Sequence, residues 1–397
     1  MIKLTRLRVF VFSAFVVLLF LYYLYRRLAP PYAIYATYTQ KELLASLSVI
    51  EERPTAKYVL FRQLQGAGFN NQIQEILLFH HLALLTSRVY VYQPLIWQKA
   101  PRRASLPLSA FLTGVTSTNS ISSAVFDKVC PPSAVVHVSL SRENDALWPH
   151  ARDVLDGPDR CVVVDDHILH WGFLASAALR PIWPTFRYYL GEHFKWSSHI
   201  LQMVQRGRPT EVEPYMALHL RRGDFEDHCR GLASSQTGFT TWATLPELAD
   251  TVFPPLLDTQ NRSSVMEHCF PSLSRILQAI DYQASINPHI TTLHVLHDGA
   301  WDHPTVYLQY YKLEAAFHSR ERVLRVGGWA GGPMKVVTHS GSLPVHNGES
   351  DWAVALDVQL AVDAAVFVGN GYSSLSTDII ALRLAKKGSR TKDITLV

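Results

Sequence analysis

Two stretches of the chain carry the same succession of hydrophobic patterns. In each, a short apolar run leads into a turn, and the turn leads into a segment whose apolar residues recur every three to four positions. Short apolar runs predict buried strands, and the longer period predicts helices. We expect strands at 58–64, 88–92, 161–164, 215–221, 292–296, 334–338 and 365–368, and helices at 70–87, 307–317, 350–365 and 374–387. This alternation predicts an α/β fold with two parallel-sheet domains and a cleft between them.

A different pattern at the N-terminus predicts a membrane anchor. Residues 9–25 form an uncharged apolar run, preceded by Lys3, Arg6 and Arg8. At about 1.5 Å per residue, a helix of this run spans roughly 25 Å, which suits a thin bilayer. The cations favour a cytosolic N-terminus. A cleaved signal peptide is the alternative, but the bulky segment 22–28 offers no cleavage site of small residues, so we expect an uncleaved anchor.

These patterns divide the chain into four parts. A cytosolic tip and transmembrane helix take residues 1–28, and a stem follows at 29–56. An N-terminal Rossmann-like domain covers 57–206 and a C-terminal one covers 210–397. The anchor predicts a single-pass type II protein of the endoplasmic reticulum or Golgi membrane, with both domains in the lumen.

The composition agrees with two folded domains. The chain has 397 residues, of which 48% are hydrophobic and 18% charged, and this is enough for a core in each domain. Its net charge of +4 is too small and too dispersed to indicate nucleic-acid binding. Asn261 opens a glycosylation sequon, which suits a lumenal protein.

The chain contains four cysteines, none of them in a C-x-x-C pair, so a zinc site is not indicated. In a lumenal chain this even number predicts two disulfides, with three possible connectivities. We favour Cys130–Cys161 with Cys229–Cys269, because each pair then stays within one half of the chain.

The segment 217–225 is the most informative part of the sequence. It alternates in period two and then meets Gly223, so that Arg221 and Asp224 lie at the C-terminal end of a strand, with His219 on the same strand. Ligands of open α/β sheets bind at such ends, and a fixed guanidinium suits a phosphate. A salt bridge from an arginine to Asp224 is the structural alternative.

Two further segments lead from a strand into a helix. Residues 66–72 begin Gly-Ala-Gly, and residues 369–376 begin with a glycine-flanked turn before Ser373 and Ser374. Helix N-termini carry free N–H groups and partial positive charge, which hold phosphate oxygens. Taken singly, the first segment is better explained as an ordinary turn and the second as a capped helix. A diphosphate in the interdomain cleft accounts for all three segments together.

The three segments, in this order, resemble the motifs of the GDP-fucose protein O-fucosyltransferases, over roughly residues 58 to 390. The family is related to the α-1,6-fucosyltransferases, which share the arginine motif. The resemblance implies an inverting glycosyltransferase of the type with two Rossmann-like domains facing a cleft (GT-B), with GDP-fucose as donor and no metal or other cofactor. The acceptor is a protein or glycan hydroxyl.

The resemblance also implies roles for individual residues. Arg221 binds the β-phosphate and neutralises the leaving diphosphate, His219 helps to hold the nucleotide, and Asp298 matches a carboxylate that reads guanine or ribose. The remaining donor contacts come from the two helix-opening segments: Gly66, Gly68, Phe69, Asn70, Ser373, Ser374 and Leu375.

One position departs from the family pattern and leaves the catalytic base open. Ala67 stands where one branch of the family has a glutamate base. Another branch places an asparagine near the reaction, and Asn70 matches it. Asp224, Glu226 and Glu75 are the remaining candidate bases. Loss of the base also keeps open a non-catalytic protein that binds the nucleotide sugar.

Other chemistries fit the sequence less well. Asp165-Asp166 after an apolar strand could hold Mn²⁺, although adjacent acidic residues at a strand end are commonly loop residues. His80 falls on an apolar helical stripe, which favours a core histidine over a ligand. No G-x-S-x-G segment indicates a hydrolase.

Overall fold

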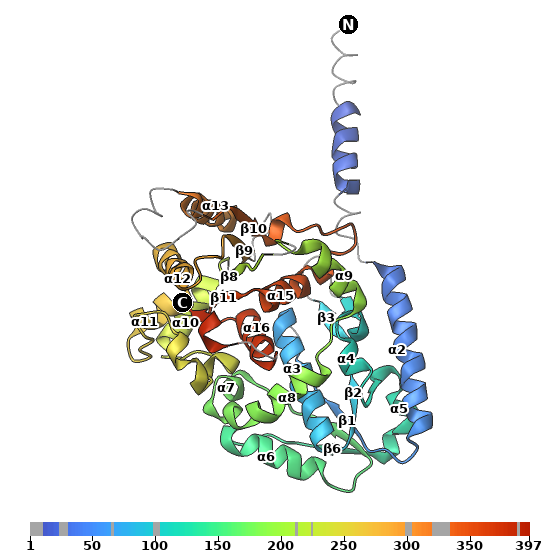
Figure 1. Cartoon of the computed structure of the whole chain (residues 1–397). Coiled ribbons are helices and arrows are strands. Elements are labelled where there is room, and N and C mark those ends of the chain that lie inside the picture. Colours follow the sequence, from blue (N-terminus) through green and yellow to red (C-terminus); the bar gives the residue numbers. More distant parts are fainter. Residues whose placement is uncertain are drawn as a thin grey trace.

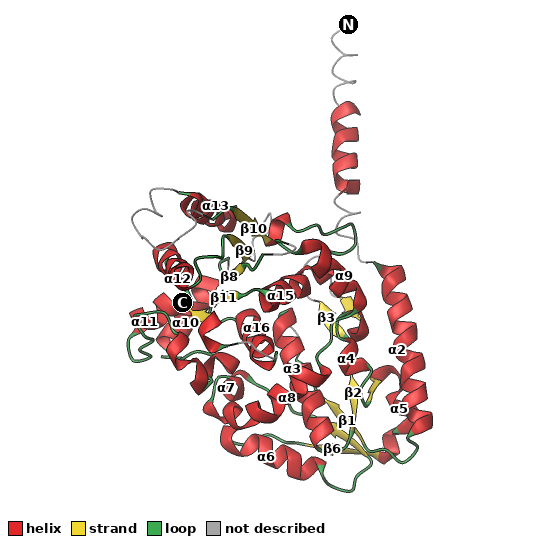
Figure 2. Cartoon of the chain, viewed as in Figure 1, coloured by secondary structure: helices red, strands yellow, loops and turns green. Residues whose placement is uncertain are grey.

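Two parallel five-stranded sheets, one in each half of the chain, form the framework of the protein (Figures 1 and 2). The computed structural model describes residues 11–23, 31–64, 67–97, 104–210, 213–223, 225–297, 304–319, 334–386 and 390–397. Helices cover the sheets, and one hydrophobic cluster contains side chains from both halves. The predicted α/β fold with two parallel sheets is confirmed.

The N-terminal sheet has the strand order β5-β2-β1-β7-β6, with every pair parallel. Its strands are β1 (Tyr58–Phe61), β2 (Val89–Tyr92), β5 (Ser120–Ser122), β6 (Val135–Val138) and β7 (Cys161–Val164). The main helices of this half are α3 (Phe69–Leu85), α6 (Asn144–Leu155), α8 (Trp183–His193) and α9 (Ser198–Gly207), with the short α4 (Thr113–Thr116), α5 (Phe126–Val129) and α7 (Trp171–Leu174). An antiparallel hairpin, β3 (Leu95–Trp97) and β4 (Ala104–Leu106), lies beside them.

The C-terminal sheet has the order β10-β9-β8-β11-β12, the arrangement of a doubly wound sheet. Its strands are β8 (Met216–Leu220), β9 (Thr292–His297), β10 (Val336–His339), β11 (Val366–Gly369) and β12 (Ile394–Leu396). Its helices are α10 (Phe225–Ser234), α11 (Arg262–Cys269), α12 (Leu273–Ile286), α13 (Pro304–His318), α15 (Ala353–Asp363) and α16 (Ser374–Ala385). In both sheets the strand order reverses beside the first strand, at β1/β7 and at β8/β11. Such reversals open the crevice in which α/β proteins bind ligands.

The residues assigned to a stem include a helix that belongs to the fold. Helix α2 (Tyr32–Glu52) lies along the N-terminal domain (Figure 1). The Ser109 backbone N–H donates to Glu42 Oε1 at 2.7 Å, and the Ser122 N–H donates to Ser46 Oγ at 2.8 Å. The Tyr35 hydroxyl donates to Asp351 of the C-terminal half at 2.9 Å. Helix α2 therefore connects both halves of the molecule.

Residues 11–23 form an exposed helix that precedes α2 in the chain. Among the described residues, no helix combines the length and the apolar character needed to cross a bilayer. The ends of the predicted anchor at 9–25 lie outside the described residues, and the anchor stays a prediction.

Both favoured disulfides are present. Cys130–Cys161 joins the end of α5 to β7, and Cys229–Cys269 joins α10 to α11. Each stays within one half of the chain, as expected. The second one fixes the helix that directly follows the Arg221 segment.

Candidate active site

A cavity of about 940 Å³ lies where loops of both halves converge. Its wall contains the residues that follow β1, β8 and β11, the three strand ends highlighted by the sequence. Eight of the predicted site residues line it: Gly68, Phe69, Asn70, His219, Arg221, Ser373, Ser374 and Leu375. Gly66, Asp224 and Asp298 lie outside the described residues. The three motifs therefore meet in one cavity.

The first motif enters the cavity at the N-terminus of α3. Gly68 is the N-cap residue and makes no side-chain cap bond, and a Cβ added to it meets nothing within 4 Å. The Gln72 amide donates to the carbonyls of Ala67 (2.9 Å) and Ile96 (2.8 Å), while the Ile96 N–H donates to Gln72 Oε1 at 2.9 Å. Gln72 thereby fastens the loop to β3, so that the first turn of α3 faces open space.

The two arginines after β8 have different surroundings. Arg221 lines the cavity and lies over the Phe225 ring, with its guanidinium carbon 4.8 Å from the ring centroid. Arg222 is buried and donates to Gln309 Oε1 and to the carbonyls of Pro271 and Arg221. Burial lowers the pKa of Arg222 to about 10, so it stays charged at neutral pH. Arg221 is thus the guanidinium placed for a ligand, and Arg222 shapes the turn that carries it.

His219 presents a neutral ring to the cavity. Burial and the nearby Arg221 cation lower its pKa to about 3. Its Nδ1 lies 2.7 Å from Ser376 Oγ, which itself accepts the Asn370 N–H at 3.0 Å. Among the described residues, His219 Nδ1 is the one acceptor within reach of the Ser376 hydroxyl hydrogen. This network assigns the ring proton to Nε2, which leaves that atom as a hydrogen-bond donor.

The third motif leads into the N-terminus of α16 and leaves it without a side-chain cap. Asn370 Oδ1 accepts the Tyr372 N–H at 2.9 Å, and its Nδ2 donates to the Cys269 carbonyl at 2.7 Å, which ties the turn to the second disulfide. Ser373 is the N-cap residue of α16 but makes no side-chain cap bond. The structural alternative of a helix capped by its N-cap serine is therefore not observed, and the first-turn N–H groups face no side-chain cap among the described residues.

Other parts of the wall were not predicted from the sequence. Trp171 of α7 contacts His228 edge-on, with ring centroids 6.1 Å apart, and Phe225 lies beside His228 at 5.2 Å. The wall further includes Thr240, Thr241, His297 and Asp357. Burial lowers the pKa of His297 to about 4, with a further contribution from His339. His297 ends strand β9, but no motif of the sequence singled it out. Trp171 comes from the N-terminal half and the other residues from the C-terminal half, so this part of the wall forms only when the two halves pack together.

Two of the candidate bases are engaged elsewhere. Glu75 is buried, pairs with His167 at 2.5 Å and accepts the Leu64 N–H at 2.8 Å, so it supports the strand end. Glu226 pairs with Arg230 on the same helix. Neither lines the cavity, where Asp357 is the one carboxylate among the described residues.

The acidic pair after β7 also has structural partners. Asp165 pairs with His137 at 2.9 Å, and Asp166 accepts the Leu140 N–H at 2.9 Å. No group of three or more histidine, cysteine, aspartate or glutamate residues suited to a metal ion occurs in the described part of the chain. His80 is fully buried between the Tyr189 hydroxyl and the Thr118 carbonyl, which confirms a core histidine.

Solved structures with the same architecture exist. Sequence comparison matches the chain to no protein-family model and to no curated protein. POFUT1 in complex with GDP-fucose superposes with a TM-score of 0.52 at 15% identity, over 86% of this chain and 97% of that chain. POFUT1 in complex with GDP gives 0.52 at 15% identity, over 86% and 98%. The chain therefore has an O-fucosyltransferase-like fold, similar to that of POFUT1. This fold is the GT-B arrangement expected from the motifs.

Proposed function

We propose that the protein transfers fucose from GDP-fucose to an acceptor hydroxyl, with inversion and without a metal ion. One observation carries the proposal: Arg221 and the uncapped N-termini of α3 and α16 line a single cavity. The likeness to POFUT1, solved with GDP-fucose and with GDP, supports the choice of donor.

The chemistry required at the cavity follows from the donor. Transfer breaks the bond between C1 of fucose and the diphosphate, and the main task is to stabilise the departing charge. The Arg221 guanidinium and the helix N–H groups supply that stabilisation, and the Nε2–H of His219 adds a neutral donor. The acceptor hydroxyl must lose its proton, and Asn70, which lines the cavity, orients that hydroxyl in our proposal. Asp224 remains a candidate base. Asp298 remains the residue proposed to bind the guanine or the ribose of the donor.

The acceptor is proposed to lie against the aromatic wall formed by Trp171, Phe225 and His228. Trp171 is 46% exposed and lines the cavity, so its ring is accessible to an acceptor. Trp171→Ala is expected to raise the KM for the acceptor at least fivefold and to leave GDP binding unchanged. Weaker GDP binding in this variant would show that Trp171 contacts the donor and not the acceptor. A protein serine or threonine is the proposed acceptor, and a glycan, as in α-1,6-type transfer, is the alternative.

A panel of sugar nucleotides tests the central proposal. The purified chain is incubated with GDP-fucose, other GDP-sugars and UDP-sugars, and nucleotide release is measured with and without acceptors. GDP-fucose is expected to be consumed selectively, and EDTA is expected to leave the rate unchanged. Turnover of UDP-sugars in place of GDP-fucose would refute the proposal.

A non-catalytic nucleotide-sugar-binding protein is the second candidate function. Ala67 favours this candidate, because it lines the cavity at the position where one branch of the family has a glutamate base. Among the described residues, Asp357 is the one carboxylate in the cavity wall. GDP binding without hydrolysis or transfer under any condition of the panel would select this candidate. In both cases we propose a lumenal location in the endoplasmic reticulum or Golgi, with membrane attachment through residues 9–25 and no nucleic-acid partner.

A further inference from the structure

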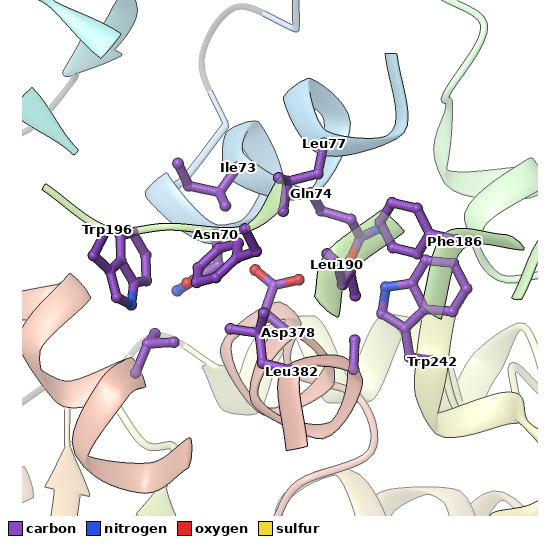
Figure 3. A pocket seen from close by; sticks show the side chains of 13 residues that line it. Asn70, Ile73, Gln74, Leu77, Phe186, Leu190, Trp196, Trp242, Asp378 and Leu382 are labelled. Carbon is purple, nitrogen blue, oxygen red and sulfur yellow. The ribbon is translucent and has the colours of Figure 1, made fainter. Parts of the chain in front are cut away.

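A second, much smaller cavity lies between helices of the two halves (Figure 3). Asn70 lines both this cavity and the large one. The small cavity has room for about 10 Å³, no more than one water molecule. Helices α3, α8, α15 and α16 contribute to its wall, which is mostly aromatic and aliphatic. Asp378 of α16 is the one ionisable group in this wall among the described residues.

Two polar side chains of the small cavity, Gln74 and Asp378, lie one helical turn behind residues that line the large cavity. Asn70 and Gln74 lie four residues apart on α3, and Ser374 and Asp378 lie four residues apart on α16, so each pair shares one helix face. The first member of each pair lines the large cavity and the second lines the small one. Figure 3 shows the Asp378 carboxyl directed from α16 toward α3, between Asn70 and Gln74.

Two buried oxygens of this cavity lack a hydrogen-bond partner among the described residues: Asp378 Oδ2 and Gln74 Oε1. Both are acceptors when the carboxyl is ionised, so they cannot satisfy each other. The side chains that face Asp378 from α8 (Phe186 and Leu190) and α15 (Val358) carry no charge. An ionised carboxylate there would be buried without a counterion, which is costly. Burial accordingly raises the pKa of Asp378 well above its usual range.

We propose that Asp378 is a protonated carboxylic acid that donates a hydrogen bond to Gln74 and so holds the first turns of α3 and α16 in register across the donor site. One proton then satisfies both oxygens without creating a buried ion. Asp378 is a positioning residue, because it acts through Asn70 and Ser374, which line the large cavity. Its effect on turnover rests on the proposed function, whereas its protonation and its link to Gln74 do not.

Infrared difference spectroscopy of the full-length protein tests the protonation directly. At neutral pH, wild type minus Asp378→Asn should show the carbonyl stretch of a protonated carboxylic acid. Absence of that band would overturn the proposal, because Asp378 would then be ionised and paired with the amide N–H of a rotated Gln74.

Thermal stability supplies a second readout that does not depend on activity. The folded state keeps a proton on Asp378 that the unfolded state releases above the ordinary carboxyl pKa, so the contribution of Asp378 to wild-type stability falls as the pH rises. The melting temperature of Asp378→Asn relative to wild type should therefore increase from pH 5 to pH 8. A constant difference between the two proteins would contradict the proposal.

Matched variants separate positioning from stability. Asp378→Asn keeps a donor toward Gln74 and is expected to retain most of the wild-type turnover of GDP-fucose. Asp378→Leu removes the donor but suits the apolar wall, so turnover is expected to fall about five- to tenfold, the effect of one lost hydrogen bond, without a lower melting temperature. Full activity of Asp378→Leu would overturn the positioning role. If wild type itself turns over no GDP-fucose, the proposed function fails, and the infrared and stability results still decide the state of Asp378.

Discussion

The adjacent arginines Arg221 and Arg222 are predicted to have opposite mutational signatures. Replacing Arg221 by alanine removes the guanidinium proposed to stabilise the leaving diphosphate. Loss of one such donor costs about 10²- to 10³-fold in rate, or roughly 2.7–4 kcal/mol. Its stacking over Phe225 and its 3.0 Å bond to the Arg222 carbonyl are partly exposed, so the free energy of unfolding should fall by only about 1–2 kcal/mol.

Replacing Arg222 by alanine is expected to affect folding instead. Its buried guanidinium donates to Gln309 Oε1, to Pro271 O at 2.7 Å and to Arg221 O at 3.1 Å, and it stacks on Phe270 at 4.5 Å. Hydrogen bonds from a charged group are each worth about 1.5–3 kcal/mol, and part of their sum is offset by the cost of burying the charge. A net loss of about 3–5 kcal/mol follows, a large share of the roughly 5–15 kcal/mol that stabilises a folded protein.

Thermal denaturation, GDP binding and GDP-fucose turnover measured on both variants check this contrast. Arg221→Lys, which keeps the charge but loses the planar fork, should fall between Arg221→Ala and wild type in turnover. Near-wild-type turnover by Arg221→Ala at unchanged GDP affinity would refute the assignment of Arg221 to the leaving group. A stable, well-folded Arg222→Ala protein would refute the structural role of Arg222.

Two further predictions concern the packing and the pH response of the fold. A Cβ at Gly371 would lie 2.5 Å from the Phe239 ring, so Gly371→Ala should cost about 1–3 kcal/mol and disturb the N-terminus of α16. The control Gly231→Ala meets nothing within 4 Å on α10 and should gain about 0.5–1 kcal/mol; equal melting temperatures of the two variants would contradict this. Burial lowers the pKa of four histidines to between about 3 and about 4: His80, His81, His219 and His297. Because these rings are neutral in the folded state and protonate first when unfolded, stability should be full above about pH 6.5 and fall towards pH 4, by up to about 5 kcal/mol per pH unit. Melting temperatures that stay level from pH 7 to pH 5 would rule this out.

The sequence predicted the site well where local chemistry decides it. Glycine loops and strand ends located α3, β8 and α16, because backbone breaks and helix N-termini are encoded within a few residues. It missed β5 and β6, whose three or four residues include polar side chains such as Ser120 and His137. It also missed the amphipathic helix α6, which contains Pro149. A strand of three or four residues that includes polar side chains is too short to show a clear hydrophobic period.

Residues far apart in the sequence required the tertiary structure. Glu75 was a candidate base until its pairing with His167, 92 positions away, placed it outside the cavity. Trp171 and His228 come from different halves and form one wall of the cavity.

By itself, the sequence determined the α/β class, the two disulfides and the three segments that converge on the cavity, since each depends on local periodicity or on spacing along the chain. The packing of one half against the other decided which carboxylates reach the cavity, and it buried Asp378 in a wall that contains no other ionisable group among the described residues. The physical reason is that hydrophobic periodicity records only that a face is buried, whereas the identity of the group that covers it depends on contacts between distant segments.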